Sequence, residues 1–276
     1  MSDKANNFTL IKNGLKHPLS IYYFLREYSR LRMNRKHPYV KSENVRSFEK
    51  YQDFLKYLID TEYKENYLSD LTDLYYNLVK RIESIYGKDM SLSILSLGEA
   101  VSVYFLVQNL KPEVVIETGV SDGMSSFFIL TALNENKKGS LYSIDLPEVG
   151  MPMLYGKEPG WIVNEVLRQR WTLIYGKSEL QLPPLLRKLK QVDIFLHDSE
   201  HSYANMKFEF SLALKHMKDG SLLLSDDARS NSAFQELLSF SGFGKSKCCL
   251  LTGSDSDLGA LIINNATKNL AEGWFL

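Results

Sequence analysis

The amino-acid sequence predicts an α/β protein, and three features of its hydrophobic pattern support that fold class. From about residue 111 onward, short runs rich in Val, Ile and Leu alternate with longer segments of helical periodicity. Before that point, apolar residues recur at helical spacing and glycines are few. Near the end, two short apolar runs follow each other too closely for a helix to connect them. The sequence therefore predicts βαβ units, a mainly parallel sheet and an antiparallel pair at its edge.

The same periodicity places the individual elements. In the first third of the chain it predicts helices at about residues 21–28, 54–59, 68–85 and 95–110. Further on, it predicts strands at residues 114–116, 141–144, 173–175, 192–196, 222–224, 247–251 and 260–263. Helices at residues 127–133, at 182–189 and up to about 217 separate these strands. We therefore expect a doubly wound, Rossmann-like, seven-stranded sheet in residues 95–276, preceded by an N-terminal helical segment in residues 1–94.

Composition narrows the class of protein. The chain has 276 residues, 44% of them hydrophobic, and its formal net charge is zero, so no overall field points to nucleic acid or to a membrane surface. The first residues are polar, and no later run reaches the roughly 18 apolar residues of a membrane-spanning helix. We expect a soluble, cytoplasmic protein. The two cysteines, Cys248 and Cys249, are adjacent in an apolar run, which is typical of buried strand residues and not of a disulfide framework or a zinc site.

Polar or glycine-rich segments follow five predicted strands in succession. In an open α/β sheet, ligands bind outside the carboxyl ends of the strands. Each segment also has a structural interpretation, such as a strand-to-helix turn, a proline-associated turn or a helix cap. Their occurrence at five successive strand ends favours a ligand site. The segments are Glu117–Ser125, Asp145, Gly176–Glu179, His197–His201 and Ser225–Asp227.

The first of these segments indicates the kind of cofactor. Its glycines allow close backbone approach to a ligand, and the helix that follows offers free N–H groups. Asp145 comes 28 residues after Glu117 and could accept the hydroxyls of a ribose. A dinucleotide fingerprint would have glycine where Glu117 stands, which disfavours a nicotinamide-dependent oxidoreductase. Gly176-Lys177-Ser178 lacks the upstream glycine of a phosphate-binding P-loop, because Trp171 stands there.

The pattern Glu117-x-Gly119-x-x-x-Gly123-x-Ser125 resembles motif I of class I S-adenosylmethionine-dependent methyltransferases. The resemblance extends over about residues 95–265 and is greatest to small-molecule O-methyltransferases of the catechol and macrocin types. It implies that the serine binds the methionine carboxylate, that the acid after the second strand binds the ribose, and that the next turn lies at the adenine. The residues expected to bind S-adenosylmethionine are Glu117, Gly119, Ser121, Gly123, Ser125, Asp145, Gly176 and Ser178.

The last two segments indicate the chemistry. Methyl transfer to oxygen requires an aligned acceptor whose hydroxyl is made more nucleophilic, and a divalent cation such as Mg²⁺ can do this. Asp198, Asp226 and Asp227 supply the carboxylates that such an ion prefers. The resemblance to the macrocin type implies that His201 is the general base, beside Asp198. The Asp-Asp pair matches neither relative fully, so a metal-free site that uses His201 alone stays open as an alternative.

Several expectations concern the surroundings of this site. His197 is not expected to take part in catalysis, and Glu200 and Glu209 are expected to be solvated on the following helix. Residues 147–160 form either a lid or a surface insertion. The resemblance implies that the N-terminal helices cover the acceptor pocket or build a homodimer. The acceptor is expected to be a small molecule or a sugar, and a non-catalytic S-adenosylmethionine-binding protein is the main alternative function.

Overall fold

One mixed sheet forms the centre of the protein in the computed structural model, which describes residues 28–29, 31–42, 45–60, 65–87, 94–146, 157–239, 247–253 and 255–264. Its strands are β1 (Arg46–Phe48), β2 (Val114–Thr118), β3 (Ser140–Asp145), β4 (Trp171–Tyr175), β5 (Val192–His197), β6 (Met217–Ser225), β7 (Cys248–Leu251) and β8 (Leu258–Ile262). They lie in the order β1-β7-β8-β6-β5-β2-β3-β4. Only β8 runs antiparallel to its neighbours, β6 and β7. The predicted fold class is confirmed.

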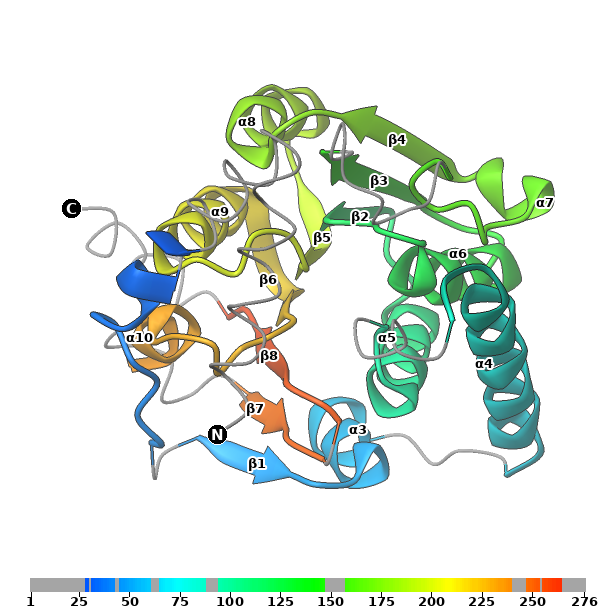
Figure 1. The fold of residues 1–276 in the computed structure, drawn as a ribbon, viewed down its shortest axis with the longest axis horizontal. Helices are drawn as coiled ribbons and strands as arrows, with labels where there is room; N and C mark the ends of the chain where they lie inside the picture. The colour runs from blue at the N-terminus through cyan, green and yellow to red at the C-terminus, as the bar shows by residue number, and fades with distance from the viewer. Residues whose placement is uncertain are drawn as a thin grey trace.

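Helices cover both faces of the sheet (Figure 1). On one side lie α8 (Ser178–Leu189), α9 (Tyr203–His216) and α10 (Ala233–Ser239). On the other lie α3 (Tyr51–Ile59), α4 (Glu65–Tyr86), α5 (Leu97–Leu110), α6 (Met124–Glu135) and the short α7 (Glu165–Arg168). Two hydrophobic clusters fill the space between helices and sheet, one on each face. Because both faces are covered, the central strands β2 and β5 are mostly buried and rich in apolar residues, without a regular alternation of polar and apolar side chains.

The sheet has one strand more than the seven that the sequence predicts. β1 pairs in parallel with β7, outside the expected edge pair, and is contributed by the N-terminal segment. It has only three residues, of which the first two are exposed, so it leaves no hydrophobic pattern in the sequence. The N-terminal segment is therefore not purely helical. The predicted helix at 21–28, apart from Tyr28, and residues 147–156 of the predicted lid lie outside the described residues.

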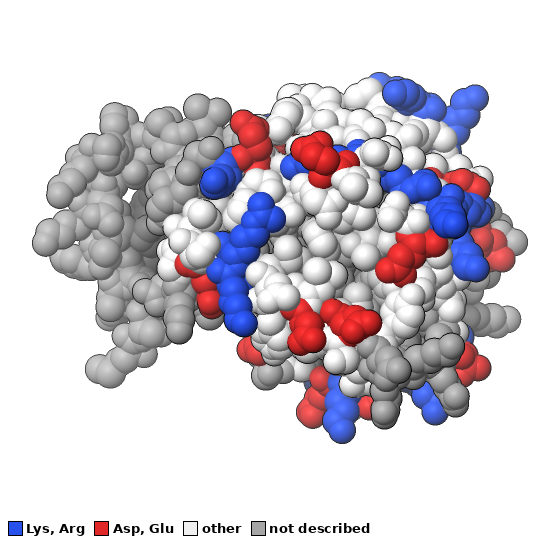
Figure 2. Space-filling model, turned by 90° about the vertical axis from the view of Figure 1, so that its right-hand side faces the viewer, with Lys and Arg blue, Asp and Glu red and all other residues white. Residues whose placement is uncertain are grey.

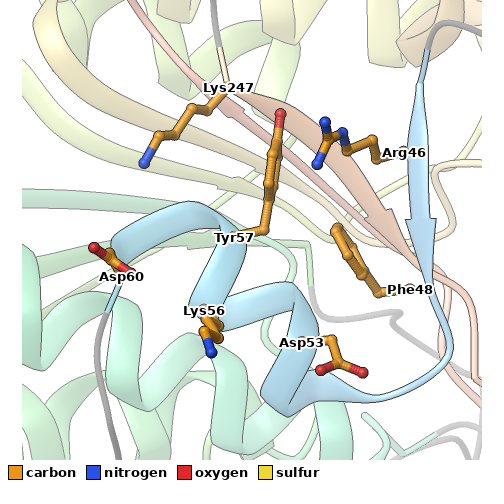
Figure 3. Close-up of a pocket in the computed structure, with 7 residues that line it drawn as sticks. All are labelled: Arg46, Phe48, Asp53, Lys56, Tyr57, Asp60 and Lys247. Atoms are coloured by element: carbon orange, nitrogen blue, oxygen red, sulfur yellow. The ribbon is translucent and has the colours of Figure 1, made fainter.

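A cavity of about 540 Å³ lies between β1 and α3, at the edge of the sheet (Figure 3). The guanidinium of Arg46 lies 5.0 Å from the centre of the Tyr57 ring. Lys247 Nζ donates a hydrogen bond of 3.3 Å to the carbonyl of Leu58, in the last turn of α3. A lysine at the carboxyl end of a helix satisfies a carbonyl that has no partner within the helix. These contacts join α3 to β1 and to Lys247, the residue before β7.

The surface agrees with the balanced composition. On the side of the molecule that carries α4, basic and acidic side chains of the described residues are interspersed (Figure 2). Among the described residues, no helix combines the length and the apolar character needed to span a bilayer.

Candidate active site

The glycine-rich loop between β2 and α6 lies directly against the segment that follows β5. Gly119 has a φ of +87°, and a Cβ atom built on it would lie 1.8 Å from the carbonyl oxygen of Asp198. Gly123 has a φ of +99°, and its Cβ would lie 2.6 Å from the Cα of Gly160. A side chain at either position would therefore collide with backbone. The two glycines allow close packing within the protein itself: Gly119 packs the loop against the end of β5, and Gly123 packs it against Gly160.

Glu117 supports this loop from below. Its side chain is completely buried and accepts hydrogen bonds from the hydroxyls of Ser125 (2.6 Å), Ser126 (2.6 Å) and Ser143 (2.7 Å). Burial raises the pKa of the Glu117 carboxyl, and the three hydroxyl donors partly oppose that rise. Ser125 thus donates its hydroxyl hydrogen to Glu117, and Ser125 is only 2% exposed. Glu117 and Ser125 thus shape the loop between β2 and α6 from within.

Asp145, at the end of β3, joins the loop to the next strand end. Its Oδ2 accepts hydrogen bonds from the backbone N–H groups of Ser121 (2.9 Å) and Val120 (3.2 Å). Its carbonyl accepts one from the N–H of Gly176 at 2.8 Å. Burial raises the pKa of the Asp145 carboxyl, and the backbone donors oppose this. The ends of β2, β3 and β4 are therefore joined by one residue, Asp145, through its carboxylate and its backbone carbonyl.

Gly176 and Ser178 form the turn from β4 into α8. Gly176 has a φ of +143°, and a Cβ there would lie 2.7 Å from Nε2 of Gln181. Ser178 is the first residue of α8, and its hydroxyl lies 3.4 Å from Oδ1 of Asn205, near the start of α9. The structure thus brings all eight predicted cofactor residues to one edge of the sheet. It does not bring all their side chains to the surface of that edge.

Three aspartates and a histidine converge at the ends of β5 and β6. His201 Nε2 lies 3.8 Å from Asp198 Oδ1, 3.9 Å from Asp226 Oδ2 and 3.7 Å from Asp227 Oδ2. These distances are too long for ordinary hydrogen bonds. One ligand atom each of Asp198, His201 and Asp226 lies within 4.8 Å of the others, a grouping that could hold a metal ion. Asp227 is not part of that group, and its side chain is half exposed.

The carboxylates of this cluster repel one another. Burial raises the pKa of Asp198 well above its ordinary value, and the neighbouring Asp226 raises it further. Burial, together with the charges of Glu99 and Asp227, raises the pKa of Asp226 to about 8. A cation placed among these groups would reverse both effects, because it would replace like-charge repulsion by attraction. The carboxylates of Asp198 and Asp226 therefore fit a hard divalent cation.

A buried glutamate that the sequence analysis placed in solvent lies beneath the cluster. Glu209 on α9 is fully buried, so the prediction that it is solvated is wrong. Its carboxylate contacts Thr118 Oγ1 (2.5 Å), His197 Nδ1 (2.7 Å) and Ser199 Oγ (2.8 Å). Burial opposes its ionisation, but the contact with His197 and the hydroxyl donors lower its pKa to about 2. One residue away in the sequence, Phe210 marks the inward face of α9, which is the signal that could have identified Glu209 as buried.

Comparisons with known proteins agree with this arrangement. The family model described as a methyltransferase domain matches residues 116–228, the stretch from β2 to just beyond β6. The fold is similar to that of a protein from Staphylococcus aureus provisionally assigned as a caffeoyl-CoA O-methyltransferase. That likeness has a TM-score of 0.52 at 13% identity and covers 71% of this chain and 99% of the other. A comparison with curated proteins finds no match.

The fold is also similar to that of an O-methyltransferase from Bacillus cereus solved in complex with S-adenosylhomocysteine. The TM-score is 0.50 at 15% identity, with coverage of 76% of this chain and 96% of the other. The family match shows that residues 116–228 are similar to a methyltransferase domain, and the fold of the chain agrees with that of the two solved structures. The resemblance to class I S-adenosylmethionine-dependent methyltransferases, inferred from the loop at Glu117–Gly123, is confirmed.

Proposed function

We propose that this chain transfers the methyl group of S-adenosylmethionine to a hydroxyl oxygen of a small molecule or a sugar. One observation carries the proposal. The predicted base His201 converges with Asp198 and Asp226 at strand ends that touch the cofactor loop, where Gly119 packs on the carbonyl of Asp198. A protein that only bound the cofactor would have no need for an imidazole among mutually repelling carboxylates. The geometry therefore favours an enzyme over a non-catalytic binding protein.

The cofactor half of the proposed site uses backbone more than side chains. The loop from Gly119 to Gly123 and the amino end of α6 would bind the methionine part, with Glu117 and Ser125 fixing the shape of the loop from beneath. Asp145 would bind the ribose, and the turn at Gly176 and Ser178 would lie at the adenine.

In the proposed reaction, the acceptor oxygen forms a bond to the methyl carbon while the carbon–sulfur bond breaks. The electron pair of that bond stays on sulfur, which gives neutral S-adenosylhomocysteine. His201 Nε2 takes the proton that the hydroxyl loses. Asp198 and Asp226 would hold a divalent cation, with Asp227 on the outer side of the site. When bound, such an ion lowers the pKa of the acceptor hydroxyl.

Calorimetric titration with S-adenosylmethionine and with NAD tests the choice of cofactor. We expect binding of S-adenosylmethionine alone, since Glu117 replaces the first glycine of a dinucleotide loop. Asp145→Ala is expected to weaken cofactor binding by about tenfold or more, because it removes the ribose acceptor and two hydrogen bonds of the loop. His201→Ala should bind the cofactor normally. Equal losses in both variants would contradict this division of roles.

Turnover tests the reaction itself. Suitable probe acceptors are catechol, caffeoyl-CoA and a nucleotide-linked deoxysugar, with release of S-adenosylhomocysteine as the measurement. We expect magnesium to support turnover and EDTA to abolish it. Full activity in EDTA would instead favour the metal-free mechanism that uses His201 alone. Methylation of amines but of no hydroxyl would contradict the proposed acceptor class.

The remaining proposals concern the whole chain. We propose a cytoplasmic protein in which residues 1–94 act as a cap or as an oligomerisation segment. Sedimentation of the full chain distinguishes a homodimer from a monomer. The described part of that segment contributes β1, α3 and α4, and these pack on the sheet and its helices.

A further inference from the structure

The segment that carries His201 has little regular structure of its own. Between the end of β5 and the start of α9, residues 198–202 form neither helix nor strand. Within these residues, the backbone hydrogen bond from the N–H of Ser202 to the carbonyl of Glu200, 2.8 Å long, provides local closure. The position of the His201 ring depends on this backbone. Its Nε2 lies 3.7–3.9 Å from three carboxylate oxygens, so a shift of less than an ångström would make or break each contact.

A side chain from far away in the sequence holds this backbone. Asn34 Nδ2 donates a hydrogen bond of 2.9 Å to the carbonyl of His201, and its Oδ1 accepts one of 3.0 Å from the N–H of Tyr203. The two residues are separated from Asn34 by 167 and 169 positions. Asn231 Nδ2 also donates to the His201 carbonyl, at 3.2 Å. The peptide group of the predicted base is thus bound by two amide side chains from different parts of the chain.

The segment around Asn34 is itself anchored at the start of α9 and at the start of α10. The ring of His37 stacks on that of Tyr203, with centroids 3.6 Å apart and planes 5° from parallel. The carbonyl of His37 accepts a hydrogen bond of 2.8 Å from Ser232, and the N–H of Val40 donates one of 3.0 Å to Gln235 Oε1. In Figure 1 this segment, coloured blue, lies beside α9 and α10. Residues 31–42 therefore form a strap over the start of α9. Asn34 in this strap contacts the catalytic segment, residues 198–202, which carries His201.

We propose that Asn34 is a positioning residue of the active site and that the strap at residues 31–42 is needed to place His201. This inference rests on the proposed function, in which His201 is the base. It assigns a role in the chemistry to the N-terminal part of the chain, which lies outside the stretch matched as a methyltransferase domain. Asn34 acts through the backbone of His201 and does not touch the acceptor.

Two substitutions separate the hydrogen bonds of Asn34. Asn34→Asp keeps the oxygen that accepts from Tyr203 but places a second oxygen opposite the His201 carbonyl, where the amide donated. Asn34→Ala removes both bonds. Gln235→Ala is the matched control, because it removes another hydrogen bond of the strap without touching the catalytic segment. The first readout is hydrogen exchange of residues 198–205 in the protein without added ligands.

The second readout is the ring signal of His201 in a histidine-labelled protein, which has only five histidines and can be assigned with His201→Gln. The His201 ring lies edge to face against the ring of His197 at 5.3 Å, so its signal reports its position. The third readout is turnover with the best probe acceptor, measured together with the affinity for S-adenosylmethionine.

We expect Asn34→Asp and Asn34→Ala to increase exchange in residues 198–205 and to shift the His201 signal, whereas Gln235→Ala does neither. Turnover should fall by about 10- to 100-fold with cofactor affinity nearly unchanged, the effect of a small displacement of a catalytic group. Normal exchange and an unshifted signal in Asn34→Asp would overturn the proposal, as would turnover equal to that of Gln235→Ala. If the unaltered protein shows no turnover with any acceptor, the proposed function fails, and the first two readouts still decide whether Asn34 holds His201.

Discussion

At the ends of β2 and β3 the carboxylates are surrounded by hydrogen-bond donors, whereas at the ends of β5 and β6 the carboxylates lie close to one another. Glu117 receives three hydroxyl donors, and Asp145 receives two backbone N–H groups on one oxygen. Burial and neighbouring carboxylates instead raise the pKa of Asp198 well above its ordinary value and that of Asp226 to about 8. The first region is complete without a ligand. The second is electrostatically unfavourable by itself, and carboxylates with perturbed pKa values of this kind are typical of functional sites.

The largest effect in this comparison is expected from Glu117→Ala. The substitution leaves three buried hydroxyls without their acceptor and opens a cavity, so the free energy of unfolding should fall by about 3 to 5 kcal/mol. Urea denaturation measures it. Glu113→Ala is the control, because its carboxylate is largely exposed beside Lys138, and such pairs contribute at most about 1 kcal/mol. A similar decrease in the free energy of unfolding in both variants would show that the hydrogen bonds of Glu117 do not stabilise the loop.

Glu209→Gln tests the network that connects the two regions, since Glu209 contacts Thr118 at the end of β2 and Ser199 after β5. Its pKa is lowered from 4.5 to about 2, so its charge stabilises the folded state above about pH 4.5, and that stability is lost as the pH falls towards 2. We expect a loss of about 2 to 4 kcal/mol at neutral pH. Urea denaturation over a pH series should show this difference shrinking in acid. A loss independent of pH would assign the effect to packing alone.

Asp226→Asn should have a smaller effect of the opposite sign. A carboxyl whose pKa is raised from 3.8 to about 8 favours folding below about pH 3.8 and loses that contribution as the pH rises to 8. In EDTA, the variant should therefore be more stable than the unaltered protein by about 1 to 2 kcal/mol near pH 8 and similar to it near pH 4. Denaturation at the two pH values measures this. Magnesium should then stabilise the unaltered protein only, and a variant less stable at pH 8 would contradict the repulsion.

The parts of this structure that sequence reasoning predicts are those with a repeating pattern. The sheet follows from apolar runs that recur because both faces are covered, and the site follows from the rule that parallel strands end at one edge. That rule predicted that Asp198 and His201, after one strand, lie near Asp226, after the next, and the structure brings these three residues together. β1 was missed because three residues, two of them exposed, carry no pattern.

Features that depend on the path of the backbone could not be predicted in this way. Ser125 belongs to the cofactor motif, yet its hydroxyl turns inward to Glu117, a direction set by the curvature of the loop. Glu209 is charged and was placed in solvent, although its helix turns it inward onto His197. Asn34 has no local signal at all, because its partners lie 167 and 169 positions away. Local sequence patterns predict where strands end, but they do not predict polar contacts between residues far apart in the sequence.

The backbone contact at Gly119 has a consequence for protein engineering. With only 1.8 Å between a Cβ at this position and the carbonyl of Asp198, neither loop can be rebuilt without the other. Libraries that vary these two strand ends would consist mostly of chains that do not fold. Residues 31–42 reach His201 and Tyr203 through the side chains of Asn34 and His37. Substitutions there should alter the placement of His201 while leaving the packed backbone of the two loops intact.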